Sequence, residues 1–206
     1  MKSLNSYIKD TYVTEGVFKN IGAEMVTVKT RNELSKLIEK TMKEKGPNCD
    51  LNFIDVSKIT DMSYLFNGSN FNGDISCWDV SNVCNMCCMF NRSDFNGDIS
   101  NWDVLNVEYM TCMFANSKFN RDISKWHVLN VTHMPGMFMD SIFAGDISSW
   151  NVSNVIDMRY TFHSSKFTGD ISGWDVSKVK HMNGMFDNSK LEKMSKLPMW
   201  YKQSSR

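Results

Sequence analysis

The chain repeats itself with a fixed period of 24 residues. Five tryptophans follow one another at this spacing, with no insertion between them: Trp78, Trp102, Trp126, Trp150 and Trp174. Each tryptophan begins a W-x-V tripeptide, and a valine, a methionine and a phenylalanine recur behind it, as Val83, Met86 and Phe90 do in the first full copy. A period without drift predicts a solenoid, in which each coil contacts only its neighbours.

The repeats divide the sequence into three parts. A degenerate sixth copy precedes the five full ones and has Ile54 in the place of the tryptophan. Residues 50–191 are therefore predicted to form a six-coil array. Residues 1–49 and 192–206 are predicted to be an N-terminal and a C-terminal cap, because the end of a solenoid would otherwise expose the apolar edge of a coil.

The N-terminal cap is predicted to contain a strand and an amphipathic helix. The stretch Glu24–Lys29 alternates apolar and polar residues, as a strand does, whereas Ser3–Val13 is only weakly amphipathic. The stretch Arg31–Lys45 places four apolar side chains on one helical face, namely Leu34, Leu37, Ile38 and Met42. The sequence Gly-Pro-Asn at 46–48 is typical of a helix end.

Each coil is predicted to contain one strand and one short helix. The tryptophan and valine of W-x-V alternate with polar residues, which indicates a strand, and strands one coil apart would form a parallel sheet. The apolar residues Val83, Met86, Met89 and Phe90 then follow with helical spacing. Polar residues before the methionine, such as Asn85, Thr132 and Asp157, would suit a helix N-cap. The expected fold is an α/β solenoid with strands on one face and helices on the other.

The full repeat unit, FNGDIS-x-WDVSNV-xx-M-xx-MF-xx-S, resembles the repeat of the BspA-like leucine-rich-repeat surface proteins. The resemblance covers residues 50–191. It implies a leucine-rich-repeat-like fold and adhesive or protein-binding roles, often on bacterial surfaces, and similar arrays occur in gut bacteria and their bacteriophages.

Composition narrows the choice of partners. The 23 basic and 23 acidic residues cancel, so charge gives no reason to expect nucleic acid. No apolar run is long enough for a transmembrane helix, and the N-terminus lacks the apolar core of a signal peptide. A cytoplasmic location is expected, or a surface location if a leader has been removed.

Three sets of residues could carry chemistry. Stacked carboxylates at Asp74, Asp98, Asp122, Asp146 and Asp170 could bind calcium, but the serine two positions after each one favours hydrogen-bonded turns. The cysteines Cys84, Cys87, Cys88 and Cys112 lack the paired spacing of a zinc site and are interpreted as small filling residues. His133, Asp157 and His181 share one column and could bind metal, but the column is interpreted as helix caps. No catalytic motif is present, and neither enzymatic activity nor a cofactor is expected.

A partner protein is expected to contact the residues that flank the inward-facing tryptophan and valine. The predicted partner-binding residues are Asp79, Asp103, Leu105, Lys125, His127, Leu129, Asn151 and Asp175. Leu105 and Leu129 stand out, because the same column holds serine in the other full repeats. They predict a small hot spot, although the variable helical face, at Tyr109, Arg159 and Tyr160, is an alternative.

The sequence therefore predicts a non-enzymatic scaffold that binds another protein. One version, which the resemblance suggests, is a bacteriophage or bacterial protein that blocks a host factor such as a defence nuclease. The alternatives are a surface adhesin and, on the cysteine or histidine columns, a metal-dependent enzyme or sensor.

Overall fold

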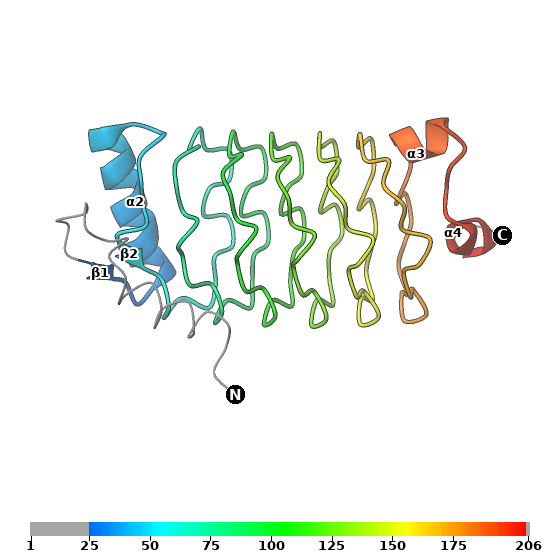
Figure 1. Ribbon diagram of the computed structural model, residues 1–206, viewed down its shortest axis with the longest axis horizontal. Helices are drawn as coiled ribbons and strands as arrows, with labels where there is room; N and C mark the ends of the chain where they lie inside the picture. Colours follow the sequence, from blue (N-terminus) through cyan, green and yellow to red (C-terminus); the bar gives the residue numbers. More distant parts are fainter. Residues whose placement is uncertain (1–24, 205–206) are drawn as a thin grey trace.

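The computed structural model describes residues 25–204, and the stretch Ser3–Val13 lies outside this range. The element order is β1 (Val26–Thr27), α2 (Arg31–Lys45), β2 (Ile54–Asp55), α3 (Lys190–Lys193) and α4 (Met199–Ser204). Between β2 and α3 the chain winds as a row of coils stacked side by side, with α2 at one end and α3 and α4 at the other (Figure 1). No helix in residues 25–204 has the length and apolar character needed to cross a membrane.

The N-terminal end of the stack is covered by α2 and extended by β1. The helix occupies the residues predicted for it and begins with a capping box, in which Thr30 and Glu33 satisfy each other's backbone N–H groups. It ends at Gly46, whose φ of 84° few other residues adopt readily. Its inner face buries Leu34 and Ile38. The strand β1 is shorter than predicted and pairs in parallel with β2 of the first coil.

Neighbouring coils pair through a backbone ladder that follows the methionine and phenylalanine columns. In one coil the N–H groups of Met86, Cys88, Phe90 and Arg92 donate to the carbonyls of the next coil, 23 positions later in the sequence. The N–H groups of alternate residues from residue 89 onward instead donate three residues back, which closes tight turns within the coil. The same alternation recurs between the first five coils and their successors. We call this segment the turn ribbon: residues 62–68 in the first coil and their equivalents in the others.

The turn ribbon replaces the predicted helices. No helix lies between β2 and α3. Cys88 and Arg92 have φ values of 54° and 55°, in the left-handed region, and the equivalent positions of every coil are also left-handed. These residues interrupt any α-helix, because a right-handed helix needs negative φ throughout. A ribbon of tight turns buries side chains at intervals of three and four residues, which a helix also does, and so the sequence pattern was misleading.

The predicted W-x-V sheet is also absent. Isolated parallel bridges run instead through Asp61, Asn85, Tyr109, His133, Asp157 and His181, one position before the methionine column. Side chains make much of the connection on the tryptophan side. For example, the Trp102 indole N–H donates to the Ile75 carbonyl at 3.2 Å, and the Asn96 N–H donates to Asn72 Oδ1 at 2.8 Å. Only β2, in the tryptophan-less first copy, forms a strand at this position.

The core consists of aromatic columns that run the length of the stack. One phenylalanine column stacks from Phe66 to Phe186, with ring centroids 5.7 Å apart between Phe90 and Phe114. A second runs from Phe71 to Phe167, and the repeat tryptophans and most of the column methionines are buried beside them. The prediction that these columns form the interior is confirmed.

Trp200 of α4 ends the aromatic core. Each repeat tryptophan donates its indole N–H to a carbonyl 27 residues earlier. Trp200 donates to the Ile171 carbonyl, 29 residues earlier, at 3.2 Å. Its ring centroid lies 6.1 Å from that of Phe186, the same distance that separates Phe162 and Trp174. Trp200 therefore stands where the tryptophan of a further coil would lie.

Candidate partner-binding surface

Leu105 and Leu129 lie side by side at one corner of the stack. Each follows the buried valine of W-x-V and enters a tight turn, closed by a hydrogen bond from Val107 to Val104 in one coil and from Val131 to Val128 in the next. The two leucines are 41% and 40% exposed. The Asn130 side chain donates to the Leu105 carbonyl, which places the two corners in adjacent coils in register. Two large apolar side chains therefore face solvent together.

The polar residues of the predicted surface mostly shape the corner. The side-chain oxygens of Asp79, Asp103, Asn151 and Asp175 each accept the backbone N–H two residues later, at distances of 3.0 to 3.2 Å. These Asx turns fix the backbone conformation just before the chain reverses direction at the corner. Hydrogen bonds from the Ser177 hydroxyl and N–H lower the pKa of Asp175 below its ordinary value.

His127 occupies the same column without a carboxylate or amide. Its side chain and that of Lys125 are exposed. Both residues precede Leu129 in the coil. The coil with Leu129 therefore presents the Lys125 ammonium and the His127 imidazole before its leucine, whereas the coil with Leu105 presents Asn101 and Asp103. The structure brings the predicted residues of these two coils onto one corner surface. Asp79 and Asn151 lie in the coils on either side, and Asp175 lies one coil further.

An open groove of about 700 Å³ runs beside the leucines, across several coils. It is lined by Asn82, Cys84, Asn106, Glu108, Asn130, Thr132, Asn154 and Lys178. The four asparagines form one column, the asparagine ladder. The Nδ2 of each donates to a carbonyl 25 residues earlier, at 2.7 to 2.9 Å. The ladder fixes the orientation of each amide and joins the coil corners.

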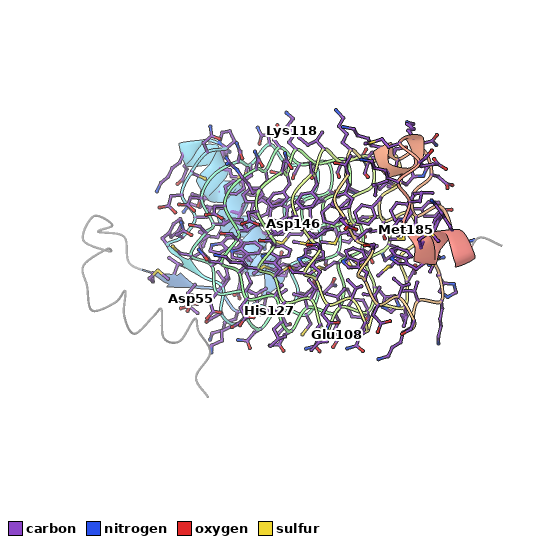
Figure 2. All side chains as sticks on the ribbon, turned by 45° about the vertical axis from the view of Figure 1, so that its right-hand side comes forward. Asp55, Glu108, Lys118, His127, Asp146 and Met185 are labelled. Carbon is purple, nitrogen blue, oxygen red and sulfur yellow. The ribbon has the colours of Figure 1, made fainter. Side chains whose placement is uncertain are left out.

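Charged and aromatic groups border the groove. Glu108 is exposed and lies on one long edge of the stack, opposite Lys118 on the other edge (Figure 2). The ring of Tyr109 stacks on that of His133 in the next coil, with centroids 5.4 Å apart. At the far end, Lys178 Nζ donates to Asn154 Oδ1 at 2.6 Å. The groove itself is lined mostly by polar and charged residues. The two leucines and the stacked ring pair belong to residues that adjoin the lining residues in the chain.

The groove residues are absent from the set predicted from the sequence. The recurrence of asparagine in W-x-V-x-N, broken only by Lys178 in the last full copy, was a signal that could have identified the ladder. No signal in the sequence shows that the asparagines line a groove, because this depends on the path of the neighbouring corners.

The aspartate column Asp74 to Asp170 forms turns, as the structural interpretation predicted. The Oδ1 of each member accepts the N–H of the serine two residues later. Hydrogen bonds from Ser124 and Ser172 lower the pKa values of Asp122 and Asp170. Among the described residues, no three His, Cys, Asp or Glu side chains lie close enough together to hold a metal ion.

The column of His133, Asp157 and His181 has no helix to cap, so that interpretation is wrong in its detail. Asp157 instead lies directly before the turn ribbon of its coil, and its Oδ1 accepts the Arg159 N–H at 3.1 Å. The Arg159 guanidinium also contacts the carboxylate, with Nη2 2.7 Å from Oδ2. Desolvation acts to raise the pKa of Asp157, but the hydrogen bonds and positive charge of Arg159 outweigh it and lower the pKa.

The cysteines are free thiols. Cys88 and Cys112 occupy one column in adjacent coils, and burial raises the pKa of both, that of Cys112 to about 11. A thiol with a raised pKa stays protonated at neutral pH, and the protonated form is a poor nucleophile and metal ligand. Both residues have left-handed backbones within the turn ribbon. Their environment therefore fits packing better than chemistry.

Comparison with known proteins identifies a family but no activity. A family model described as "Mycoplasma protein of unknown function, DUF285" matches residues 32–142 and again residues 117–201. The two matches overlap and together cover residues 32–201. No curated protein matches the chain, and no solved structure matches it.

Proposed function

Because the chain belongs to the DUF285 family of repeat-containing proteins, whose function is unknown, we propose that it is a non-enzymatic scaffold that binds another protein. Repeat arrays usually bind partners through an extended face built from several units. In the finer version of this proposal the chain is a leucine-rich-repeat-like solenoid of the BspA-like kind. The repeat FNGDIS-x-WDVSNV supports that version.

The observation that carries the proposal is the exposed pair Leu105 and Leu129. Both residues are about two-fifths exposed in adjacent coils, whereas the tryptophan and phenylalanine columns of the repeat are buried. Their corners are tied together by the asparagine ladder. Adjacent apolar side chains on a preformed surface can be desolvated by a partner with little ordering of the scaffold.

The resemblance to BspA-like proteins suggests two settings for this binding. In the first, the chain is a bacteriophage or bacterial protein that binds and inhibits a host factor inside the cell, such as a defence nuclease. In the second, it is a surface adhesin that attaches to a host or to another cell. Both settings use the same corner surface and differ in where the partner is found.

The test is affinity purification from the native host with the wild-type chain and with the double variant Leu105→Asp, Leu129→Asp. We expect the wild type to capture a specific protein and the variant to lose it while keeping its circular dichroism spectrum. The matched control is Ser153→Asp with Ser177→Asp, which adds two charges to the same column in adjacent coils. If the leucine variant captures the same protein as well as the wild type, the binding surface lies elsewhere.

A further inference from the structure

The groove beside the leucines presents hydrogen-bond acceptors that the protein leaves without donors. The ladder amides of Asn106 and Asn130 use Nδ2 on backbone carbonyls. Each amide plane is thereby fixed, which leaves Oδ1 as the acceptor and the second N–H of Nδ2 as a donor. Within residues 25–204, no donor reaches the Oδ1 of either side chain. The Glu108 carboxylate on the same groove is exposed, and no cation in this part of the chain pairs with it.

The protein itself shows which group fits such an acceptor. In the last full copy of the repeat, the asparagine of the ladder is replaced by Lys178. Its ammonium donates to Asn154 Oδ1, one coil earlier, at 2.6 Å. A primary ammonium therefore binds the asparagine ladder at Asn154 Oδ1. The hydrogen bond from Nδ2 of the same amide to the Leu129 carbonyl fixes the orientation of that oxygen. The equivalent Oδ1 atoms of Asn106 and Asn130 have the same orientation but no ammonium.

Charge favours the middle of the groove over its ends. The column that contains Glu108 holds Cys84, Thr132, Ile156 and Lys180 in the other full copies. The ladder column ends in Lys58 on one side and Lys178 on the other. A cation would be repelled at both ends and attracted next to Glu108. Lys125 and His127 precede Leu129 in the coil, whereas the groove residues Asn130 and Thr132 follow it.

We propose that this groove binds a lysine side chain of the partner protein. Its ammonium would contact the Glu108 carboxylate and the Oδ1 atoms of Asn106 and Asn130. Its aliphatic stem would lie against Leu105 and Leu129, as lysine stems lie on apolar surface while the charged end remains hydrogen-bonded. This inference rests on the proposed function and names the chemistry of the partner at that site.

The test uses the full chain, labelled with ¹⁵N, and two capped peptides as probes: acetyl-Gly-Leu-Lys-Leu-Gly-amide and its twin with norleucine in place of lysine. We expect the lysine peptide to shift the side-chain amide resonances of Asn106 and Asn130 in a saturable way. The norleucine peptide should shift them much less. Glu108→Gln should lower the affinity for the lysine peptide by about fivefold, the size expected for an exposed charge pair. Glu44→Gln, which removes the same charge at an exposed position on α2, should leave the affinity for the lysine peptide unchanged.

Three results would overturn the inference: equal binding of the two peptides, unchanged binding by Glu108→Gln, or no shift at the two asparagines. Affinity purification from the native host distinguishes failure of the lysine site from failure of the proposed function. If the partner is lost by Leu105→Asp with Leu129→Asp but retained by Glu108→Gln, the scaffold proposal stands and the lysine site falls. If neither variant affects capture, both proposals for this corner are wrong.

Discussion

Each repeat tryptophan joins neighbouring coils in two ways, by its ring and by its indole N–H. Trp126 is buried, stacks on Trp150 with centroids 6.4 Å apart, and donates to the Ile99 carbonyl at 3.0 Å. Trp126→Ala removes both and leaves a cavity, so we expect the free energy of unfolding to fall by roughly 3–5 kcal/mol. Urea denaturation followed by circular dichroism would measure this.

Trp126→Phe separates the ring from the hydrogen bond. Phenylalanine keeps an aromatic surface for Phe114 and Trp150 but leaves the Ile99 carbonyl without its donor. An unsatisfied buried acceptor costs about 1–3 kcal/mol, so this variant should lie between the wild type and Trp126→Ala. A loss as large as that of the alanine variant would show that the hydrogen bond, rather than the ring, dominates.

Asp157 should make stability depend on pH. Its pKa is lowered in the folded protein, so its contribution is fully present above the unfolded value near 3.9 and is lost as pH falls through the lower folded value. Asp157→Asn keeps an oxygen for the Arg159 N–H but loses the ion pair. We expect the variant to be less stable than the wild type by about 1 kcal/mol at pH 7, with a difference that shrinks below pH 4. A constant difference from pH 7 to pH 2 would contradict this.

Which residues are buried was the most predictable property of this structure. The fixed period alone identifies the buried tryptophan, phenylalanine and methionine columns, because a residue at the same place in every coil meets the same environment. Comparison of copies also identifies Leu105 and Leu129 as exceptions. The groove was not predictable in this way. The Asn106 amide donates a hydrogen bond to a carbonyl of another coil, and the Glu108 side chain lines the groove. Neither relation can be seen in the spacing of the repeat.

The turn ribbon is the element that sequence patterns misjudged. Residues Val83, Met86, Met89 and Phe90 have the spacing of a helix, and all four are buried as a helix would bury them. The difference lies in the backbone: left-handed residues are frequent in the ribbon, but only some of them are glycine. The position of Cys112 holds glycine in the next coil, Gly136, but tyrosine or cysteine in three others. Without a consistent glycine, nothing in the sequence marks the turn.

Gly136 tests the ribbon geometry. Its φ is +64°, and an added Cβ would lie 2.9 Å from Cys112 Sγ. We expect Gly136→Ala to lower the free energy of unfolding by about 1–2 kcal/mol, the cost of a left-handed residue with a side chain. The control is Gly173→Ala, where the backbone is not left-handed and an added Cβ meets nothing within 4 Å. Equal effects of the two substitutions in urea denaturation would argue against the left-handed turn.

The whole stack has a direction, because the turn ribbon of each of the first five coils donates N–H groups to the carbonyls of the next coil on the C-terminal side. At the N-terminal end, Arg31 of α2 donates to the Ser63 carbonyl at 2.6 Å and so covers part of the acceptor edge. At the C-terminal end, Glu192 of α3 accepts the Asn188 N–H at 2.8 Å. Within residues 25–204, the N–H groups of Met182 and Gly184 have no acceptor. The helical caps therefore cover the aromatic core more fully than they cover the backbone ladder of the turn ribbons.

Hydrogen exchange would reveal this open end. The amides of Met110 and Cys112, at the same positions in a central coil, donate to the carbonyls of His133 and Pro135 at 2.9 Å. Amides with such bonds exchange only when the structure opens locally, whereas amides without them exchange in the native state. We expect Met182 and Gly184 to exchange at least tenfold faster than Met110 and Cys112, an excess that corresponds to about 1.4 kcal/mol of protection. Equal protection at the two sets would mean that the amides of Met182 and Gly184 have acceptors and that the ladder is closed at this end.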